Sequence, residues 1–298
     1  MIVLKYRGGM GNKFFVYCYG RILAEQLNYA LSCKKIDGFS NAAPIDGLRC
    51  HESPVKLFFG TKDAILEDIK NNRHHKIVSQ FSMQEYSLYK DHKEKIRGWL
   101  KPDLELDGNN LSHLDFRVKK NGKFEKTTVE SIWSEDLIVI QRLKNFVDLR
   151  VDLKFNYFAA ILKKISFKRL FIISDEPESE MFNQFAEYSP VYLFGDPLTH
   201  YSFPMLFKKM VISQSTFCWW IAWMSDATEI YFPLTANGYW SERWMTYNHV
   251  NLVVDEDRYR MVREIPQESE FVFEDKNKVL KSVVAEARKN RKIGYPEW

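Results

Sequence analysis

The sequence predicts an α/β protein built on a mainly parallel β-sheet, and three observations support this fold class. A glycine-rich turn near the start of the chain separates a short apolar run from a long amphipathic segment. Apolar stretches of strand length then alternate with stretches of helical periodicity, most clearly in the second half of the 298 residues. Strands that alternate with helices form βαβ units. The length suffices for two modest domains or one large domain.

The composition is that of an ordinary globular chain with a weak positive balance. The formal net charge of +4 is compatible with phosphate-bearing ligands and too small to indicate nucleic acid. The four cysteines lie far apart without a C-x-x-C pair, so we expect neither a disulfide framework nor a zinc site. No run reaches the roughly 18 apolar residues of a transmembrane helix, and no signal peptide is visible. We expect a cytoplasmic protein, with association to a membrane surface through basic residues left open.

The glycine-rich turn is the stretch from Tyr6 to Phe15, between a predicted strand at residues 1–4 and a predicted helix through Leu27. Backbone N–H groups and the dipole at the start of a helix favour an anion. The glycine spacing matches neither G-x-G-x-x-G nor a P-loop. Asn12 can cap the helix or hold a substrate hydroxyl, and a tight turn capped by Asn12 is the simpler interpretation of the local residues.

The remaining first half is less regular, and we divide the chain into an N-terminal domain, residues 1–130, and a C-terminal domain, residues 131–298. The elements predicted before residue 131 are strands at 29–32 and 75–79, helices at 61–71 and 83–100, an irregular stretch at 36–60, and a polar connection with one hairpin at 101–130.

The second half has the clearer α/β pattern. The predicted strands are 136–142, 169–174, 191–194, 210–213, 229–232 and 250–254; the predicted helices are 153–165, 178–185, 217–224 and 276–292, with a helical turn at 203–209. Because ligands of parallel sheets bind beyond the carboxyl ends of the strands, we expect Arg142, Asp175, Ser213 and Ser215 around one crevice.

Two features near these strand ends have the chemistry of a diphosphate-binding site. Hydroxyl groups and free N–H groups between Ser213 and Phe217 suit a diphosphate, although Ser215 or Thr216 also suits ordinary helix capping. Arg142 can neutralise a phosphate or form a surface salt bridge. The D-x-D spelling at residues 255–257 is that of metal-dependent sugar transferases, but its charge run favours a solvated turn. We expect Trp219, Trp220 and Trp223 to pack in the core.

Three separated stretches share their order and spacing with one enzyme family. The stretch from Gly8 to Tyr17 is similar to G-G-L-G-N-Q-M-F-Q-Y, and the stretch from Gln84 to Asp91 is similar to Q-S-x-x-Y-F. The stretch from Ile212 to Trp223 resembles I-A-N-S-T-F-S-W-W-x-A-W and is the most specific of the three. Together they resemble the α-1,2-fucosyltransferases of glycosyltransferase family 11 over roughly residues 1–260.

The chain departs from that family at its H-x-R-R-x-D motif. Here the corresponding positions hold Ile140, Arg142, Leu143 and Asn145, so only the first arginine is retained. The resemblance implies that Arg142 contacts the donor diphosphate. The other differences leave the donor open between GDP-fucose and a UDP-sugar such as UDP-xylose.

The resemblance implies two Rossmann-like domains facing a cleft, the GT-B arrangement. It further implies an inverting, metal-independent transfer of a sugar from a nucleotide sugar to a glycan hydroxyl, with no cofactor. Arg142 and the start of the helix after Ser215 would stabilise the leaving diphosphate. The donor-binding residues expected on this basis are Gly9, Gly11, Asn12, Arg142, Asp175, Ser213, Gln214, Ser215, Thr216 and Phe217.

The catalytic base is the least determined part of this expectation. An inverting transferase usually needs a carboxylate or histidine beside the acceptor hydroxyl, and Asp148 and Asp152 are the candidates, with helix capping as the alternative. Two other classes stay open: a non-catalytic glycan- or nucleotide-binding module, and a phosphoryl transferase. The second would require a metal site, and the sequence has no Walker-type lysine.

Overall fold

The computed structural model describes residues 2–6, 8–46, 77–78, 83–144, 153–236, 240–247, 250–265 and 270–283. The protein is α/β, and its chain groups into two compact units. The first unit comprises Met1–Asp103, Met245–Val253 and Val283–Trp298, and the second comprises Leu104–Trp244 and Val254–Ser282. The predicted helix at 61–71 and most of the irregular stretch at 36–60 lie outside the described residues.

The first unit opens with the predicted strand, turn and helix. Strand β1 (Ile2–Lys5) leads through the glycine turn into α1 (Met10–Leu27), and β1 pairs in parallel with β2 (Leu31–Ser32) and β3 (Ile77–Val78). Helix α1 ends where Asn28 adopts a left-handed conformation at φ 55°. The helix is buried over most of its middle, so its apolar periodicity reflects core packing.

The predicted helix at 83–100 is wrong in its first half. Two short 3₁₀ turns, η2 (Tyr86–Leu88) and η3 (Lys90–His92), precede α3 (Lys93–Trp99). Tyr89 lies fully buried between them, and its hydroxyl donates to the Met83 carbonyl oxygen at 2.5 Å. Burial of this ring and its hydroxyl holds the chain in tight turns where sequence periodicity favoured a continuous helix.

The predicted strand at 250–254 is also wrong. This stretch forms only an isolated bridge, between Asn251 and Glu85, and no strand. Its apolar residues Leu252, Val253 and Val254 are nevertheless buried. An apolar run therefore signalled burial here, and burial alone does not require a ladder of hydrogen bonds.

The second unit is organised on one largely parallel, mixed sheet. Among the described residues its nine strands have the order β12-β11-β10-β9-β6-β7-β8-β4-β5. The strands from β6 to β11 pair in parallel with their neighbours, and antiparallel pairs close both ends of the sheet. Their bounds are β4 (Asp115–Lys120), β5 (Lys123–Thr127), β6 (Leu137–Gln141), β7 (Leu170–Ser174), β8 (Val191–Phe194), β9 (Lys209–Ile212), β10 (Glu229–Leu234), β11 (Tyr259–Ile265) and β12 (Glu270–Glu274).

The two antiparallel ends of the sheet were predicted only in part. The expected hairpin is present as β4 and β5, with Asn121 and Gly122 at positive φ in its turn. We expected this hairpin to be part of a connection between domains, but β4 pairs with β8, so the hairpin belongs to the sheet. Strands β11 and β12 were not predicted; β11 mixes charged residues with buried Met261 and Val262.

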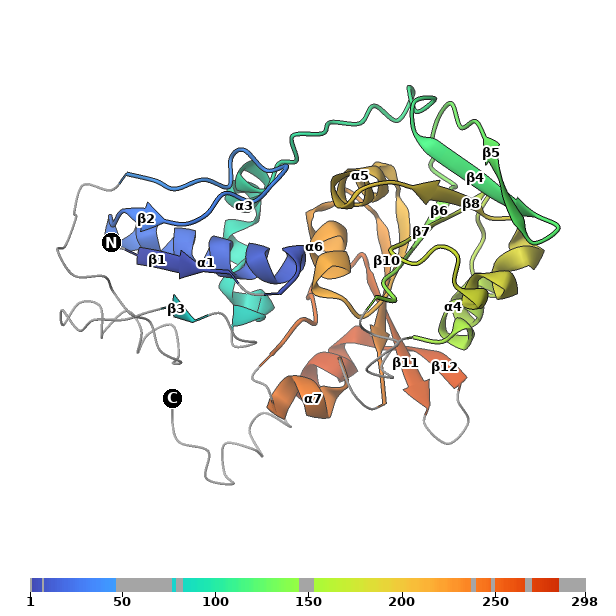
Figure 1. Ribbon diagram of the computed structural model, residues 1–298. Helices are drawn as coiled ribbons and strands as arrows, with labels where there is room; N and C mark the ends of the chain where they lie inside the picture. Colours follow the sequence, from blue (N-terminus) through green and yellow to red (C-terminus); the bar gives the residue numbers. More distant parts are fainter. Residues whose placement is uncertain are drawn as a thin grey trace. The chain divides into compact units, whose positions relative to one another are not determined.

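Helices cover both faces of this sheet. In Figure 1, α4 (Phe155–Leu162) and α6 (Thr216–Met224) lie on opposite sides of its strands. Leu137 and Val139 of β6 pack in a core cluster with Tyr157 of α4, whereas the intervening strand residues face the other layer. On that other side, Phe171 of β7 contacts Phe203 at 5.9 Å between ring centroids. The remaining helical elements of this region are η4 (Glu180–Tyr188), α5 (Pro197–Ser202), η5 (Phe203–Leu206) and α7 (Glu242–Tyr247), with residues 276–283 also helical.

The strand order gives the parallel sheet a point where the direction of strand addition reverses. From β6 the chain adds β7 and then β8 on one side, and it later adds β9, β10 and β11 on the other. The carboxyl ends of β6 and β9 therefore lie side by side at a topological switch point. Ligands of open α/β sheets bind at such points.

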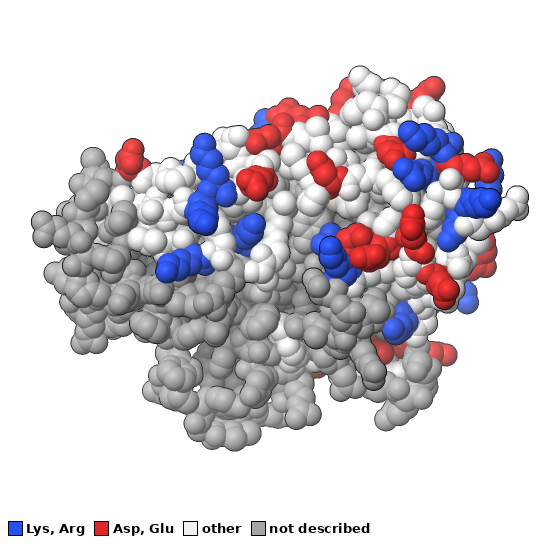
Figure 2. Space-filling model, viewed as in Figure 1, with Lys and Arg blue, Asp and Glu red and all other residues white. Residues whose placement is uncertain are grey.

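The charged surface is mixed in sign. Figure 2 shows acidic and basic side chains interspersed over the described residues on one face. Pairs such as Arg117–Asp115 and Lys120–Glu125 on the β4–β5 hairpin illustrate this local balance. Within the part of the chain that the structure describes, no helix is long and apolar enough to cross a membrane.

Candidate functional site

The carboxyl ends of β6 and β9 are joined through Arg142 and Ser213. The backbone N–H of Arg142 donates to the Ser213 hydroxyl oxygen at 3.0 Å, and the Ser213 N–H donates to the Ile140 carbonyl oxygen at 3.0 Å. The Arg142 guanidinium lies over the Phe217 ring, 5.2 Å from its centroid. These contacts fix a cation at the switch point of the sheet, directly beside the start of α6.

Asp175 follows β7 and holds the loop after β6. Its carboxylate accepts hydrogen bonds from the backbone N–H groups of Leu143 at 2.8 Å and Lys144 at 3.2 Å. The same carboxylate lies 3.3 Å from the Arg142 guanidinium, with the Asp175 side chain only 10% exposed. Asp175 therefore orients Arg142 within the protein. Its expected role as a donor-binding residue stays a prediction.

The start of α6 is capped as the sequence suggested. Ser215 accepts a hydrogen bond from the Phe217 N–H at 3.3 Å, while its carbonyl oxygen accepts from the Trp219 N–H at 2.9 Å. Ser213, Gln214 and Ser215 are buried, and Thr216 is the first helical residue. The N-terminus of this buried helix carries a partial positive charge next to Arg142. The two positive groups together suit an anion.

The rest of α6 anchors the site in the core. Trp219, Trp220 and Trp223 are fully buried and contact one another with ring centroids 5.1 to 5.5 Å apart, so the prediction of core packing is confirmed. Cys218 lies 3.5 Å from the Ser213 hydroxyl oxygen through its sulfur. Burial raises the pKa of the Cys218 thiol to about 11, so this cysteine stays protonated and packs as a small apolar group.

His200 belongs to the same region and was missed by the sequence reasoning. It lies on α5 after the carboxyl end of β8, and its side chain is buried. Burial, reinforced by the positive charge of Arg142, lowers its pKa to about 4. The imidazole is therefore neutral at pH 7. The available signal was its position shortly after a strand end, as for Arg142, Asp175 and Ser213.

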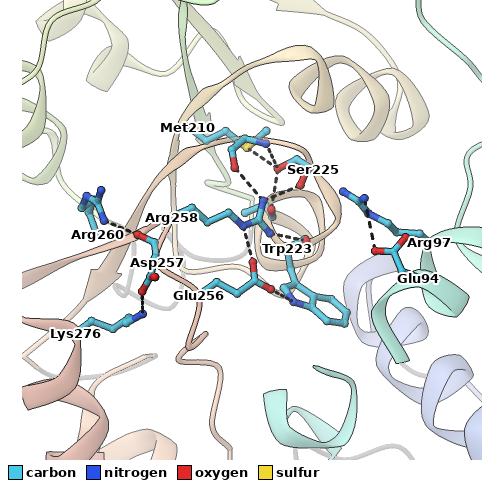
Figure 3. Close-up of polar contacts among 12 residues, drawn as sticks. Glu94, Arg97, Met210, Trp223, Ser225, Glu256, Asp257, Arg258, Arg260 and Lys276 are labelled. Carbon is cyan, nitrogen blue, oxygen red and sulfur yellow. Dashed lines mark hydrogen bonds and ion pairs between the residues drawn. The ribbon is translucent and has the colours of Figure 1, made fainter. Parts of the chain in front are cut away.

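The D-x-D stretch holds the other end of α6, as Figure 3 shows. Glu256 accepts a hydrogen bond from the Trp223 indole at 3.0 Å and pairs with Arg258 at 2.5 Å. Arg258 donates to the carbonyl oxygens of Trp223 and Ser225 at 2.8 and 2.7 Å, where the helix ends. Asp257 is exposed and pairs with Lys276 at 3.1 Å. The two aspartates of this stretch are exposed in a turn, and Arg258, which follows them, places its positive charge at the negative end of α6.

The positions that depart from the family motif are packing positions here. Ile140 is fully buried within β6, and Leu143 is 1% exposed in the core cluster that includes Leu153 and Tyr157. Neither side chain offers a polar group. Asn145, Asp148 and Asp152 lie outside the described residues, so both base candidates stay predictions.

The glycine turn of the first unit is built without a side-chain cap. Gly9 is the N-cap of α1 in an extended conformation, and Asn12 lies inside the first turn, so the interpretation of Asn12 as the cap is wrong. Gly8 has φ 75°, and a β-carbon there would lie 2.5 Å from the Asn12 amide nitrogen. Asn12 accepts a hydrogen bond from Gln84 at 3.3 Å, and Gly11 is buried. The turn thus joins two of the three stretches that carry the family resemblance.

The comparisons with known proteins add no family to this picture. The sequence matches no protein-family model and no curated protein. Among the residues that the structure describes, no group of three or more His, Cys, Asp and Glu side chains could hold a metal ion.

Proposed function

We propose that the protein is a glycosyltransferase that moves a sugar from a nucleotide-sugar donor to a glycan hydroxyl with inversion. The observation that carries the proposal is the pairing of Arg142 with the N-terminus of α6 at the switch point of a parallel sheet. Across the sheet the parallel strands lie in the order β8-β7-β6-β9-β10-β11. When they are numbered along the chain from β6, this is the order 3-2-1-4-5-6 of doubly wound nucleotide-binding sheets. This order supports a Rossmann-like donor domain, with the GT-B arrangement as its extension.

The chemistry follows from where charge develops during transfer. As the bond between the anomeric carbon and the diphosphate breaks, negative charge grows on the leaving diphosphate oxygens. A guanidinium held by Asp175 and Phe217, together with the positive end of the α6 dipole, would stabilise this charge without reorganisation. These groups can perform the task that a metal ion performs in D-x-D transferases. Losing one such contact typically costs about 100-fold or more in rate.

The donor stays open between GDP-fucose, which the family resemblance favours, and a UDP-sugar such as UDP-xylose. Asp148 or Asp152 would activate the acceptor hydroxyl by accepting its proton. For the location of the reaction we propose the cytoplasm. If Asp148→Asn and Asp152→Asn both retained near-normal kcat, neither carboxylate would be the base.

The first test is a thermal-shift screen against GDP, UDP, CMP and ADP, each with and without EDTA. A nucleotide present at 100 times its Kd should stabilise the protein by about 2.7 kcal/mol. The shift should be lost in Arg142→Ala and retained in Arg117→Ala. Arg117 is a matched control because its side chain is 31% exposed against 28% for Arg142, pairs with an aspartate and stacks on Phe194. No shift with any nucleotide would contradict the proposal.

A second candidate function is nucleotide-sugar or glycan binding without transfer. The apolar, buried character of Ile140 and Leu143 favours it, because both positions are polar in the family motif. A nucleotide-induced shift combined with no transfer from any sugar nucleotide tested would support this candidate.

A further inference from the structure

The His200 side chain carries a hydrogen-bonding group that the candidate site has not used. His200 is 7% exposed and lies on α5, between the carboxyl end of β8 and the N-terminal part of α6. Tyr201 beside it contacts Phe217 with 6.0 Å between ring centroids. Arg142 and Asp175 are near enough for their charges to act on the imidazole. His200 therefore lies after a fourth strand end, at the same edge of the sheet as Arg142, Asp175 and Ser213.

The hydrogen bonds of the ring identify which nitrogen is available. The imidazole is hydrogen bonded to the Leu193 backbone, and Nε2 is buried without a partner among the described residues. The bond to the backbone carbonyl therefore comes from Nδ1–H, which leaves the lone pair on Nε2. A buried acceptor without a donor costs free energy in the absence of ligand. A ligand that supplies a donor removes that cost.

The chemistry of the site limits what this donor can be. Ionised diphosphate oxygens only accept hydrogen bonds, so the lone pair of a neutral imidazole cannot bind them. The groups that flank the diphosphate of a nucleotide sugar on both sides are ribose and sugar rings, which carry hydroxyl donors. Building on the proposed function, we infer that His200 Nε2 accepts a hydrogen bond from a hydroxyl group of the donor substrate, next to the diphosphate.

Two neutral substitutions distinguish the role of Nδ1 from the role of Nε2. In His200→Asn the side-chain amide can replace Nδ1–H at the Leu193 carbonyl while no acceptor reaches the Nε2 position. In His200→Gln the longer side chain restores an acceptor there. His200→Phe is a second removal variant, and His113→Asn is the control because His113 is exposed in the same unit. Melting temperatures and far-ultraviolet spectra establish which variants fold.

The measurement is the Kd of each folded variant for GDP, 2′,3′-dideoxy-GDP and GDP-fucose by calorimetry. If the ribose supplies the hydroxyl, His200→Asn weakens GDP about 10-fold and no longer distinguishes GDP from the dideoxy analogue. If the transferred sugar supplies it, GDP binding is unchanged and GDP-fucose weakens about 10-fold. In both cases His200→Gln restores most of the affinity and His113→Asn changes nothing.

Other results would overturn either the inference alone or the proposed function as well. Wild-type affinities of the removal variants for both GDP and GDP-fucose would overturn the inference while leaving the proposed function in place. If the wild-type protein bound UDP instead of GDP, the same comparison would use UDP, 2′,3′-dideoxy-UDP and UDP-xylose. If it bound no nucleotide at all, the proposed function would fail and the inference with it.

Discussion

At the scale of single residues, the geometry of the Arg142 guanidinium matters as much as its charge. The group is planar, stacks on Phe217 and pairs with Asp175. A lysine would retain the charge but lose the fixed stacking plane and the bidentate donors. We expect Arg142→Lys to recover only part of the nucleotide affinity that Arg142→Ala loses, as measured by the Kd for GDP or UDP. Equal affinities of the lysine variant and the wild type would show that charge alone suffices.

His200 makes the stability of the protein depend on pH. Its pKa is about 4 in the folded protein against 6.5 for an unperturbed histidine. Between these values the unfolded chain binds a proton that the folded chain does not, so the free energy of unfolding falls as the pH drops from 6.5 towards 4. The expected loss from this residue is about 3 kcal/mol.

Urea unfolding of the wild type and His200→Gln at pH 7 and pH 4.5 tests this expectation. The glutamine variant should lose less stability than the wild type on acidification, because glutamine does not titrate. If the free energy of unfolding fell equally in the two proteins, His200 would be protonated in the folded state at pH 4.5. Other titrating groups contribute equally to both proteins and cancel in the comparison.

At the residue scale, the sequence identified site residues whose neighbours along the chain already indicate their role. Arg142 and Ser215 were predicted because a cation or hydroxyl follows an apolar run. His200 was not predicted, because its neutral state arises from burial and from Arg142, which is distant along the chain. Asn12 was misinterpreted as a cap because the helix begins at Met10, two residues before it.

At the scale of elements, α6 depends on its cap at Ser215. Replacement of a capping serine by alanine typically costs about 1 kcal/mol, whereas asparagine retains the acceptor. We expect Ser215→Ala to lower the free energy of unfolding by this amount and to weaken nucleotide binding, because the first turn frays. Ser215→Asn should keep both properties, as followed by chemical denaturation and calorimetry.

The control for this prediction is another capping residue of the same unit. Asp275 precedes the helix at residues 276–283 and accepts from the Lys278 N–H at 2.9 Å. Asp275→Ala should lower stability by a similar amount while leaving Arg142, His200 and α6 in place. If Ser215→Ala destabilised the protein without weakening the nucleotide, the start of α6 would be a structural cap and no part of the anion site.

The elements predicted best are the apolar strands in the middle of the parallel sheet. The predicted bounds of β8 are the observed ones, and those of β6, β7 and β9 differ by no more than one residue at either end. The misses lie where tertiary contacts override local pattern. Helix α5 has only six residues, and β12 gains its ladder solely from β11. In such cases the partner decides the structure, and the partner cannot be read from the local sequence.

At the scale of the whole molecule, the proposed reaction should proceed without a divalent cation. Fixed positive groups at the end of β6 and at the start of α6 are expected to carry the leaving-group charge. Sugar transfer assayed with saturating EDTA should therefore keep the kcat measured without it. Loss of turnover in EDTA with recovery on adding Mn²⁺ would contradict this mechanism, and substitution of Asp255 or Asp257 would then locate the metal.

The hydrogen bond between Arg142 and Ser213 joins residues 71 positions apart in the chain, so we expect the candidate site to form late in folding. Contacts between residues so far apart require a large loop to close, and such contacts form slowly. During synthesis, β6, β7 and β8 leave the ribosome before β9 can pair with β6 and bring the start of α6 beside the cation. Recovery of nucleotide binding during refolding should therefore lag behind the recovery of secondary structure, and chain fragments ending before β9 should lack the anion site altogether.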